Sequence, residues 1–497
     1  MISKLQHLKQ NKNDITLILL AVASVGLASI VSLAVNLVNN PIIVILGIVG
    51  LAGFTAIATR LEFGLFILIF ITYTRLSDVL VHEHSLPSIA QPLSLLLLVI
   101  IVGRWAFLNE KPLRQIEIPL VLLGAYGLVG FAAMLYAQDT SRVQDALATY
   151  IKDVIITVLI IILLRRTSTF RAVIWTLLLA GIFMGSITAY QQLTGTYENI
   201  YWGFGLAKIQ NIVGKSNDYR IAGPIGDPNF YGQILLVIIP LALERLWHEN
   251  RLVLRILAGW ALAVCLLSAI FTFSRGAFLG LIVIAALSVW HYRIRFVPLL
   301  ITILLGSVLL QFVPEQYSER VQTMTNLIPG ISQEDARHDS SFRGRLSETQ
   351  AGWRMFTDHP LLGVGLNNYA VHYQTYSRQI GIDSRLEDRA AHNLYLEIAA
   401  ETGLLGLFVF GTLLAFTFYG LTKAYSTLNQ AGQWHEANML RAFTIGLIGY
   451  LIAAFFLHAA YPRYMWLLLG IGMAISQTLN STTDMAEQNV LAVKMGF

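Results

Sequence analysis

The 497-residue chain is poor in the residues that soluble proteins use most. Only 13% of its residues are charged and it holds one cysteine, Cys265, whereas 56% of its residues are hydrophobic. A single cysteine excludes a disulfide framework and a thiolate metal cluster. A mean hydropathy of +0.63 excludes a soluble protein of this length. The composition therefore predicts a polytopic membrane protein, and a net charge of only +5 gives no sign of nucleic-acid binding.

Apolar runs recur along the whole chain. About 20 apolar residues span a bilayer, so we predict fourteen spans, or twelve if close neighbours merge. They lie near residues 15–35, 41–59, 62–74, 89–107, 116–135, 151–164, 172–193, 231–246, 253–273, 277–291, 297–312, 394–422, 440–460 and 464–478. The expected fold is an all-α transmembrane bundle. The first span follows a basic N-terminus without a small-residue cleavage site, which is typical of a retained signal anchor.

The positions of the cations predict the orientation. With the N-terminus in the cytoplasm, alternation places 18 of the 34 Lys and Arg residues inside and five in short outer turns. The other eleven fall in two long outer loops, named here the first loop (residues 194–230) and the second loop (residues 313–392). We therefore divide the chain into residues 1–312 with eleven spans, the second loop, and residues 393–497 with the last spans and a cytoplasmic tail.

An arginine interrupts the apolar stretch IFTFSRGAFLGLIV, residues 270–283. A charge inside hydrocarbon is costly, and alternation places Arg275 at the outer end of two spans, where orientation does not require a cation. Snorkelling to the interface is the simple alternative. Ser274, Gly276 and Gly280 allow close helix packing. The guanidinium is then expected to face the outer side of the bundle.

A second polar group is predicted at the same outer side, where HNLYLEIAAETGLLG begins at His392. At about 100° per residue, His392, Ala399, Gly403 and Gly406 share one helix face, which predicts the close approach of a neighbouring helix. His392 is either a candidate base or an interfacial histidine. Asn393 either orients this imidazole or caps the helix.

Both loops are expected to be structured. The first loop ends in the turn-forming run GPIGDPN, directly before a span. In the second loop, RLSETQAGWRMFTDHP predicts a helix that Ser347 caps and Pro360 ends, lying against the membrane face. Glu397 and Glu401 lie in the span that follows, and we expect them to hydrogen-bond rather than to react.

Acidic residues and histidines elsewhere do not favour a metal site. Three carboxylates cluster in the second loop, but their basic and serine neighbours favour a solvated stretch. These are Glu334, Asp335 and Asp339. His82 and His84 form a pair without a third ligand, so we interpret them as interfacial. Arg75 and Asp78 predict a structural ion pair at an outer helix end.

The polar stretches together resemble one family, the O-antigen ligase and O-antigen polymerase superfamily. The matching spacing is His392-Asn393, nine residues, Gly403, two residues, Gly406. FSRGAFLG is similar to the family's arginine-containing motif, and RIAGPIGDPN and HPLLGVGLNNY continue the likeness. The resemblance covers roughly residues 200–410, and the rest of the chain only by hydropathy.

The resemblance implies a glycosyltransferase of the GT-C class that needs neither a metal nor another cofactor. Such enzymes take a glycan from undecaprenyl diphosphate at the periplasmic face of the bacterial inner membrane and move it to an acceptor hydroxyl, with inversion. The acceptor is lipid A-core in ligases and another lipid-linked glycan in polymerases, and some relatives glycosylate proteins. Arginines neutralise a diphosphate without a metal, and histidine has a suitable pKa for a general base.

By this resemblance His392 is the general base, and Arg275 and Arg220 bind the diphosphate. Arg343 and Arg345, in SFRGRLSE, are candidates for phosphate or acceptor contact, with solvated loop charges as the alternative. The choice between ligase and polymerase stays open, because both use the same donor.

Two rival functions remain. One is a polytopic solute transporter, such as the bicarbonate transporters described in a branch of the superfamily. A transporter is expected to place polar residues near the bilayer midplane, whereas the candidates here gather at one face. The other is a non-catalytic assembly subunit, in which the arginines and His392 would be dispensable.

Overall fold

The computed structural model describes residues 53, 55–57, 59–108, 116–213, 216–292, 340–382, 388–458 and 462–475. Two predicted spans, near residues 15–35 and 297–312, lie outside the described residues, as does most of the span near 41–59. The acidic cluster at Glu334 also lies outside them.

The chain divides into two compact units. Unit 1 comprises residues 1–68 and 92–111, and unit 2 comprises residues 69–91 and 112–497. Helices α3 (Leu61–Tyr73) and α5 (Ala90–Leu108) contribute residues to both. In unit 1 a Cβ on Gly64 would lie 2.5 Å from the Leu97 side chain, so glycine allows the close packing there. The three-part division predicted above stays a prediction.

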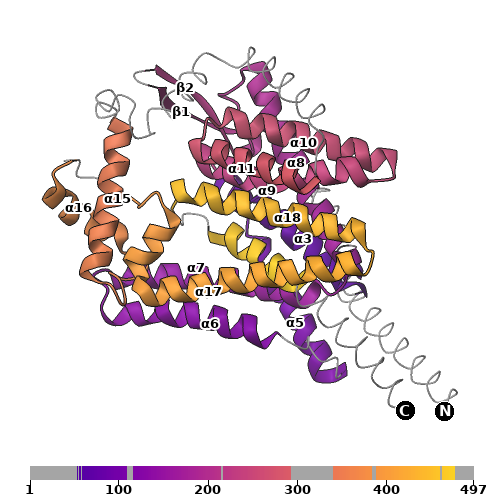
Figure 1. Cartoon of the computed structure of the whole chain (residues 1–497), viewed down its shortest axis with the longest axis horizontal. Helices are drawn as coiled ribbons and strands as arrows, with labels where there is room; N and C mark the ends of the chain where they lie inside the picture. The colour runs from indigo at the N-terminus through magenta and orange to yellow at the C-terminus, as the bar shows by residue number, and fades with distance from the viewer. Residues whose placement is uncertain are drawn as a thin grey trace, which may run out of the picture. The chain divides into compact units, whose positions relative to one another are not determined.

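Unit 2 is built from helices, most of them long and apolar (Figure 1). They are α4 (Leu76–His84), α6 (Glu117–Ala132), α7 (Thr140–Leu163), α8 (Thr167–Thr194), α9 (Pro228–His248), α10 (Leu252–Phe271), α11 (Arg275–Tyr292), α17 (Leu394–Gln430), α18 (Trp434–Ala453) and the shorter Pro462–Ile475. Within the described ranges of the whole chain, nine helices are long and apolar enough to cross a membrane, or ten if the bent pair α3–α4 is one span. The predicted all-α polytopic bundle is confirmed, and the total span count stays a prediction.

The prediction for the sixth span was too short. Helix α7 begins at Thr140, well before residue 151, because Asp139 caps it by accepting a hydrogen bond from the Arg142 backbone N–H. The polar sequence TSRVQDALATY continues the helix beyond its apolar part. Hydropathy detects only the length of helix that suits lipid, so it missed this extension.

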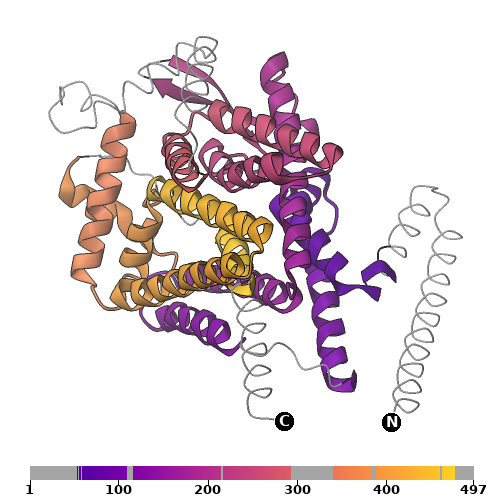
Figure 2. The ribbon, with the colours of Figure 1, turned by 45° about the vertical axis from the view of Figure 1, so that its right-hand side comes forward.

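The first loop contains a feature that the all-α expectation did not include. Strands β1 (Leu206–Val213) and β2 (Ser216–Gly223) pair as an antiparallel hairpin, with Lys208 opposite Arg220. Strand β2 contacts α8, α9 and α10, and the hairpin lies beside α10 in Figure 2. The loop is therefore structured, as its turn residues predicted.

Arg75 holds the turn that follows the hairpin. Its Nη1 atom donates to the carbonyl oxygens of Pro224 and Ile225, at 3.4 and 3.2 Å. Its Nε atom lies 3.0 Å from Asp78 Oδ2, so the predicted structural ion pair is present. The turn before α9 is thereby fixed from the side of α4.

The second loop contains helices α15 (Ser340–Asp358) and α16 (Tyr369–Ile380). Helix α15 ends ahead of Pro360, as predicted, but it begins at Ser340, so Ser347 is not its cap. Ser347 is buried in mid-helix and its Oγ lies 3.1 Å from the Tyr373 hydroxyl, which donates to it.

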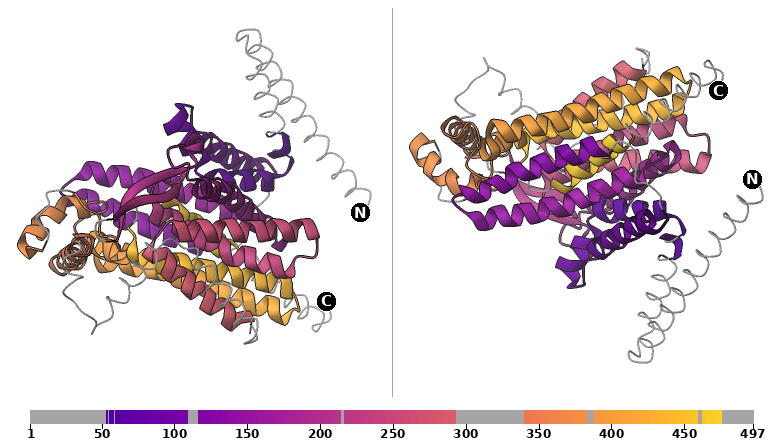
Figure 3. Two further views of the ribbon diagram at one scale, coloured as in Figure 1. Left: turned by 90° about the horizontal axis from the view of Figure 1, so that it is seen from above. Right: turned by 90° about the horizontal axis from the view of Figure 1, so that it is seen from below.

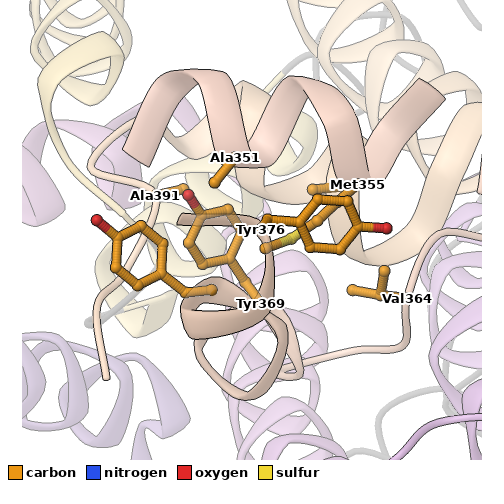
Figure 4. Packing of buried hydrophobic residues seen from close by; sticks show 8 residues of the cluster. Ala351, Met355, Val364, Tyr369, Tyr376 and Ala391 are labelled. Carbon is orange, nitrogen blue, oxygen red and sulfur yellow. The ribbon is translucent and has the colours of Figure 1, made fainter. Parts of the chain in front are cut away.

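Helix α15 runs across the direction of α17. In Figure 3 it is seen nearly end-on while α17 and α18 lie lengthwise, side by side. A small hydrophobic core joins α15, α16 and the chain before α17 (Figure 4). Its members include Ala351, Met355, Val364, Tyr369, Tyr373, Tyr376 and Ala391.

Gly403, the first glycine of the HN…G..G motif, packs against the second loop rather than against a neighbouring helix. Gly403 interrupts α17 with φ 62° and ψ −161°. A Cβ there would lie 2.4 Å from the Leu361 carbonyl carbon. The Leu404 N–H donates to the Pro360 carbonyl at 2.7 Å, and the Gly365 N–H donates to the Glu401 carbonyl at 2.9 Å. At Gly403 the expected approach of a helix was therefore wrong, because the HPLLGVG segment lies there.

Glu401 hydrogen-bonds, as predicted, and its partners are backbone groups. Its carboxylate accepts from the Asn367 N–H at 2.8 Å and the Tyr369 N–H at 3.0 Å, at the start of α16. This contact and the interrupted helix at Gly403 fix the second loop to α17.

Candidate functional site

The ends of several helices meet in one region. Helix α9 begins at Pro228, α11 begins at Arg275, and the 3₁₀ turn Ala454–Phe456 continues α18. A Cβ on Gly276 would lie 3.2 Å from the Ala453 carbonyl oxygen, so α11 and the end of α18 pack closely. The Tyr395 hydroxyl donates to the Leu451 carbonyl at 2.8 Å, which joins the start of α17 to the same region.

A cavity of about 250 Å³ lies between these ends. The residues that line it come from α11, α15, the start of α17 and the end of α18. They are Arg275, Arg345, Leu346, Thr349, Ala391, His392, Asn393, Phe455 and Phe456. Four of the six predicted site residues, far apart in the sequence, thus line one cavity. The side chain of Arg343 lies outside the described residues, although α15 includes its backbone.

Arg220 lies beside these arginines and is almost completely buried. Its Nε donates to the Thr272 carbonyl at 2.8 Å, and its Nη2 donates to Asn229 Oδ1 at 2.9 Å. Burial lowers the pKa of Arg220 to about 10. Asp227 opposes this shift, while the charges of Arg345 and Arg275 contribute to it. Three guanidinium groups in mutual range repel one another, and a bound anion relieves that repulsion.

Arg275 occupies the first residue of α11 after a tight turn. Phe273 has φ 50°, in the left-handed region, and Ser274 Oγ accepts from the Ala277 N–H at 3.3 Å. A Cβ on Gly280 would lie 3.0 Å from the Gly449 carbonyl oxygen. The predicted close packing at Gly276 and Gly280 is therefore confirmed, with helix α18 against both glycines and Leu236 of α9 also against Gly280.

His392 lies just before α17 rather than on it. Its φ of 47° is left-handed, and Asn393 caps the helix by accepting from the backbone N–H groups of Tyr395 and Leu396, both at 3.1 Å. The helix-face argument for His392 was therefore wrong. Of the two roles considered for Asn393, the structure has the cap.

The surroundings of His392 favour its neutral form. Burial, together with the nearby His458, Arg345 and Arg389, lowers the pKa of His392 to about 3. The His458 ring lies 5.1 Å away, centroid to centroid. An imidazole with this pKa is unprotonated at neutral pH and is able to accept a proton.

Three residues near His392 were not found from the sequence. Glu348 Oε2 lies 4.0 Å from His392 Nε2, and Glu348 Oε1 lies 3.0 Å from Arg389 Nη1. Burial also lowers the pKa of His458. No local spacing connects residues 348, 389 and 458 with residue 392, because only the tertiary fold brings them together.

The described part of the chain contains no group of three or more His, Cys, Asp or Glu side chains arranged to hold a metal ion. His84 Nε2 lies 3.2 Å from the Trp202 carbonyl oxygen. Independence from a metal stays a prediction.

The region that builds most of this cavity also matches a known family. Residues 260–411 match the family model for O-antigen ligase. The chain carries an O-antigen ligase domain. No curated protein matches the chain. The resemblance to the O-antigen ligase and polymerase superfamily is confirmed over this region, and it supports a membrane glycosyltransferase of that general type. The O-antigen ligase domain contains Arg275, Arg345 and His392, whereas Arg220 precedes it.

Proposed function

We propose that this protein transfers a glycan from undecaprenyl diphosphate to an acceptor hydroxyl at the periplasmic face of the bacterial inner membrane. The observation that supports the proposal best is that Arg275 and Arg345 line one cavity with His392, while Arg220 lies within electrostatic range. A diphosphate leaving group gains charge as its bond to the sugar breaks. Guanidinium groups stabilise that charge through bidentate hydrogen bonds.

In this mechanism Arg220, Arg275 and Arg345 hold the two phosphates of the donor. His392 takes the proton from the acceptor hydroxyl while that oxygen bonds to the anomeric carbon. The bond between the anomeric carbon and the phosphate oxygen breaks, and its electron pair leaves with the diphosphate. A single displacement inverts the anomeric configuration.

Donor binding is expected to prepare the base. The negative charges of the diphosphate offset the positive charges of the arginines, one of the causes that lower the pKa of His392. The pKa therefore rises when the donor is bound. After proton transfer the imidazolium faces Glu348, which lies 4.0 Å away and stabilises the positive charge.

The acceptor is a lipid A-core, another lipid-linked glycan or another hydroxyl compound, and the proposal includes both ligase and polymerase. The polyprenyl chain of the donor stays in the membrane. The arginines supply the cationic charge, so no metal ion is required.

Purified protein in lipid nanodiscs, supplied with a lipid-diphosphate glycan and a panel of acceptors, tests the proposal. We expect transfer in the presence of EDTA, an inverted linkage, and a loss of about 10²–10⁴-fold in kcat for His392→Ala. Equal rates for parent and variant contradict the mechanism. Solute flux in proteoliposomes that lack lipid-linked glycan supports the transporter instead.

A further inference from the structure

A second cavity, of about 300 Å³, borders the start of α17. Helices α6, α7 and α17 and the helix Pro462–Ile475 form its walls. Leu394, two residues after His392, lines it, and the same Leu394 also lines a smaller cavity together with His458. The second cavity therefore lies near the candidate base, and its residues take no part in the mechanism above.

Aromatic rings form one part of its lining. Tyr126, Tyr150 and Trp466 are in mutual contact, with ring centroids 5.1 to 5.5 Å apart. The Tyr150 hydroxyl donates to the Leu123 carbonyl at 2.6 Å, which fixes the position of its ring. Aromatic rings present flat apolar faces, which suit the C–H faces of a pyranose ring.

The charged groups of this lining are carboxylates. Asp145, Glu397 and Glu401 line the cavity, and its described lining includes no lysine or arginine. The Glu401 carboxylate accepts two backbone N–H groups, so Asp145 is the carboxylate assigned to a ligand. Carboxylates accept hydrogen bonds from hydroxyl groups and repel phosphates. The cavity therefore suits a neutral polyhydroxylated ligand and disfavours a diphosphate.

We infer that this cavity binds a neutral sugar unit of the acceptor glycan, an inference that rests on the proposed function. Its volume lies at the lower end of the range for ligand pockets, about 300–1,000 Å³, which suits one or two sugar units. The donor diphosphate and the acceptor sugar are thus separated by charge, because Arg275 and Arg345 line the cavity at His392 whereas Asp145 lines the second cavity. Acidic sugars are excluded from this position.

Sugar binding without a donor tests the inference independently of transfer. The probes are methyl glycosides of glucose, galactose and N-acetylglucosamine, with glucuronic acid as the charged counterpart, and saturation-transfer NMR on the full chain in nanodiscs measures their binding. We expect at least one neutral glycoside to bind, and glucuronic acid to bind at least about tenfold more weakly. If none of the three neutral glycosides binds, the inference is overturned.

Variants then locate the binding. Tyr126→Leu removes a ring face and Asp145→Asn removes a charge, and each is expected to weaken binding about tenfold. Tyr126→Phe keeps the ring and is expected to bind like the parent. Asp388→Asn is the matched control, because Asp388 is an exposed carboxylate that pairs with Arg142 and does not line this cavity. Equal binding by Asp145→Asn, Tyr126→Leu and the parent overturns the inference.

Transfer kinetics separate this inference from the proposed function. We expect Asp145→Asn to raise the acceptor KM about tenfold and to leave the donor KM within about twofold of the parent value. Transfer with an unchanged acceptor KM overturns the acceptor site and leaves the proposed function intact. If the parent transfers nothing but still loses sugar binding on Asp145→Asn, the proposed function fails and the sugar site stands.

Discussion

Buried arginines lie at both ends of helix α9, and their surroundings differ. Arg245, in its last turn, lies 2.5 Å from Glu244 and 3.4 Å from Glu249. Arg220 is bonded to Asn229 in the first turn of α9 and to the Thr272 carbonyl, both neutral groups. Near Arg220 the carboxylate of Asp227 opposes its charge, whereas the charges of Arg345 and Arg275 add to it, so three cations share this region.

The difference indicates that Arg245 stabilises the fold, whereas Arg220 is placed to bind an anion. At the Arg245 end, carboxylates balance the cation, and Arg171 adds a second contact to Glu249 at 2.7 Å. Breaking a buried ion pair leaves a charge without compensation and is strongly destabilising. At the Arg220 end positive charge accumulates, an arrangement that becomes favourable when an anion binds. The predictions below test this contrast in order of decreasing effect.

The largest effect is expected from a pair of alanine substitutions. Arg275→Ala should lower kcat about 10²–10³-fold, because one cation on the leaving group is lost, with little change in thermal stability. Arg245→Ala should instead destabilise the fold by about 3–5 kcal/mol, because Glu244 stays buried with its charge. Transfer assays and thermal unfolding of both variants in nanodiscs check this. If Arg275→Ala unfolds the protein and Arg245→Ala does not, the contrast is wrong.

A conservative pair gives a smaller effect. Arg220→Lys keeps the charge but loses the planar guanidinium that reaches both the Thr272 carbonyl and Asn229. We expect transfer to fall about tenfold. Arg171→Lys, at the other end, is about half exposed and should change stability by less than about 1 kcal/mol, with transfer unaffected. Transfer rates of the parent and both variants are measured at saturating donor. Full activity of Arg220→Lys would contradict a role for the planar guanidinium of Arg220.

Inorganic diphosphate should stabilise the protein by binding only to the arginines near the start of α9, which are Arg220, Arg275 and Arg345. A ligand at 100 times its Kd adds about 2.7 kcal/mol to the free energy of unfolding, so the Tm of the parent should rise. Arg275→Ala should lose most of that rise, whereas Arg171→Lys should keep it. Equal Tm shifts in the parent and Arg275→Ala would mean that the anion binds elsewhere.

Much of the fold followed from the sequence. Apolar runs are long and local, so they indicated each described span of unit 2. Arg275, a cation between two apolar runs, was identified from the sequence as a candidate site residue, and it lines the cavity. Hydropathy failed where a helix continues into polar sequence, as at Thr140 in α7. It also gave no sign of the hairpin, which depends on backbone pairing between β1 and β2.

The parts of the site that involve tertiary contacts were not predictable from spacing. Helical periodicity placed His392 on α17, but Asn393 takes the cap position and excludes His392 from the helix. Gly403 suggested a neighbouring helix, yet a backbone with φ 62° is what admits the HPLLGVG segment. Glu348 approaches His392 from α15, 44 residues earlier in the chain, and no periodicity spans such a distance.

The smallest expected effect is on the pH dependence of transfer, through the charges of the arginines near His392. The folded pKa of His392 is lowered to about 3, below the ordinary value of 6.5, so the imidazole stays neutral as pH falls through 6.5. The kcat/KM for the donor, which reports the free enzyme, should therefore show no acid limb from His392 near pH 6.5.

Bound diphosphate raises the pKa of His392, so the acid limb of kcat should lie at higher pH than that of kcat/KM. Arg345→Gln removes one of the lowering charges, so the limb of kcat/KM should move upward by a few tenths of a pH unit, on the order of the effect of one screened charge. Profiles of kcat and kcat/KM between about pH 2 and 8, a range that includes the His392 pKa of about 3, measure both displacements. Coincident limbs near pH 6.5 in parent and variant would show that the arginines do not act on His392.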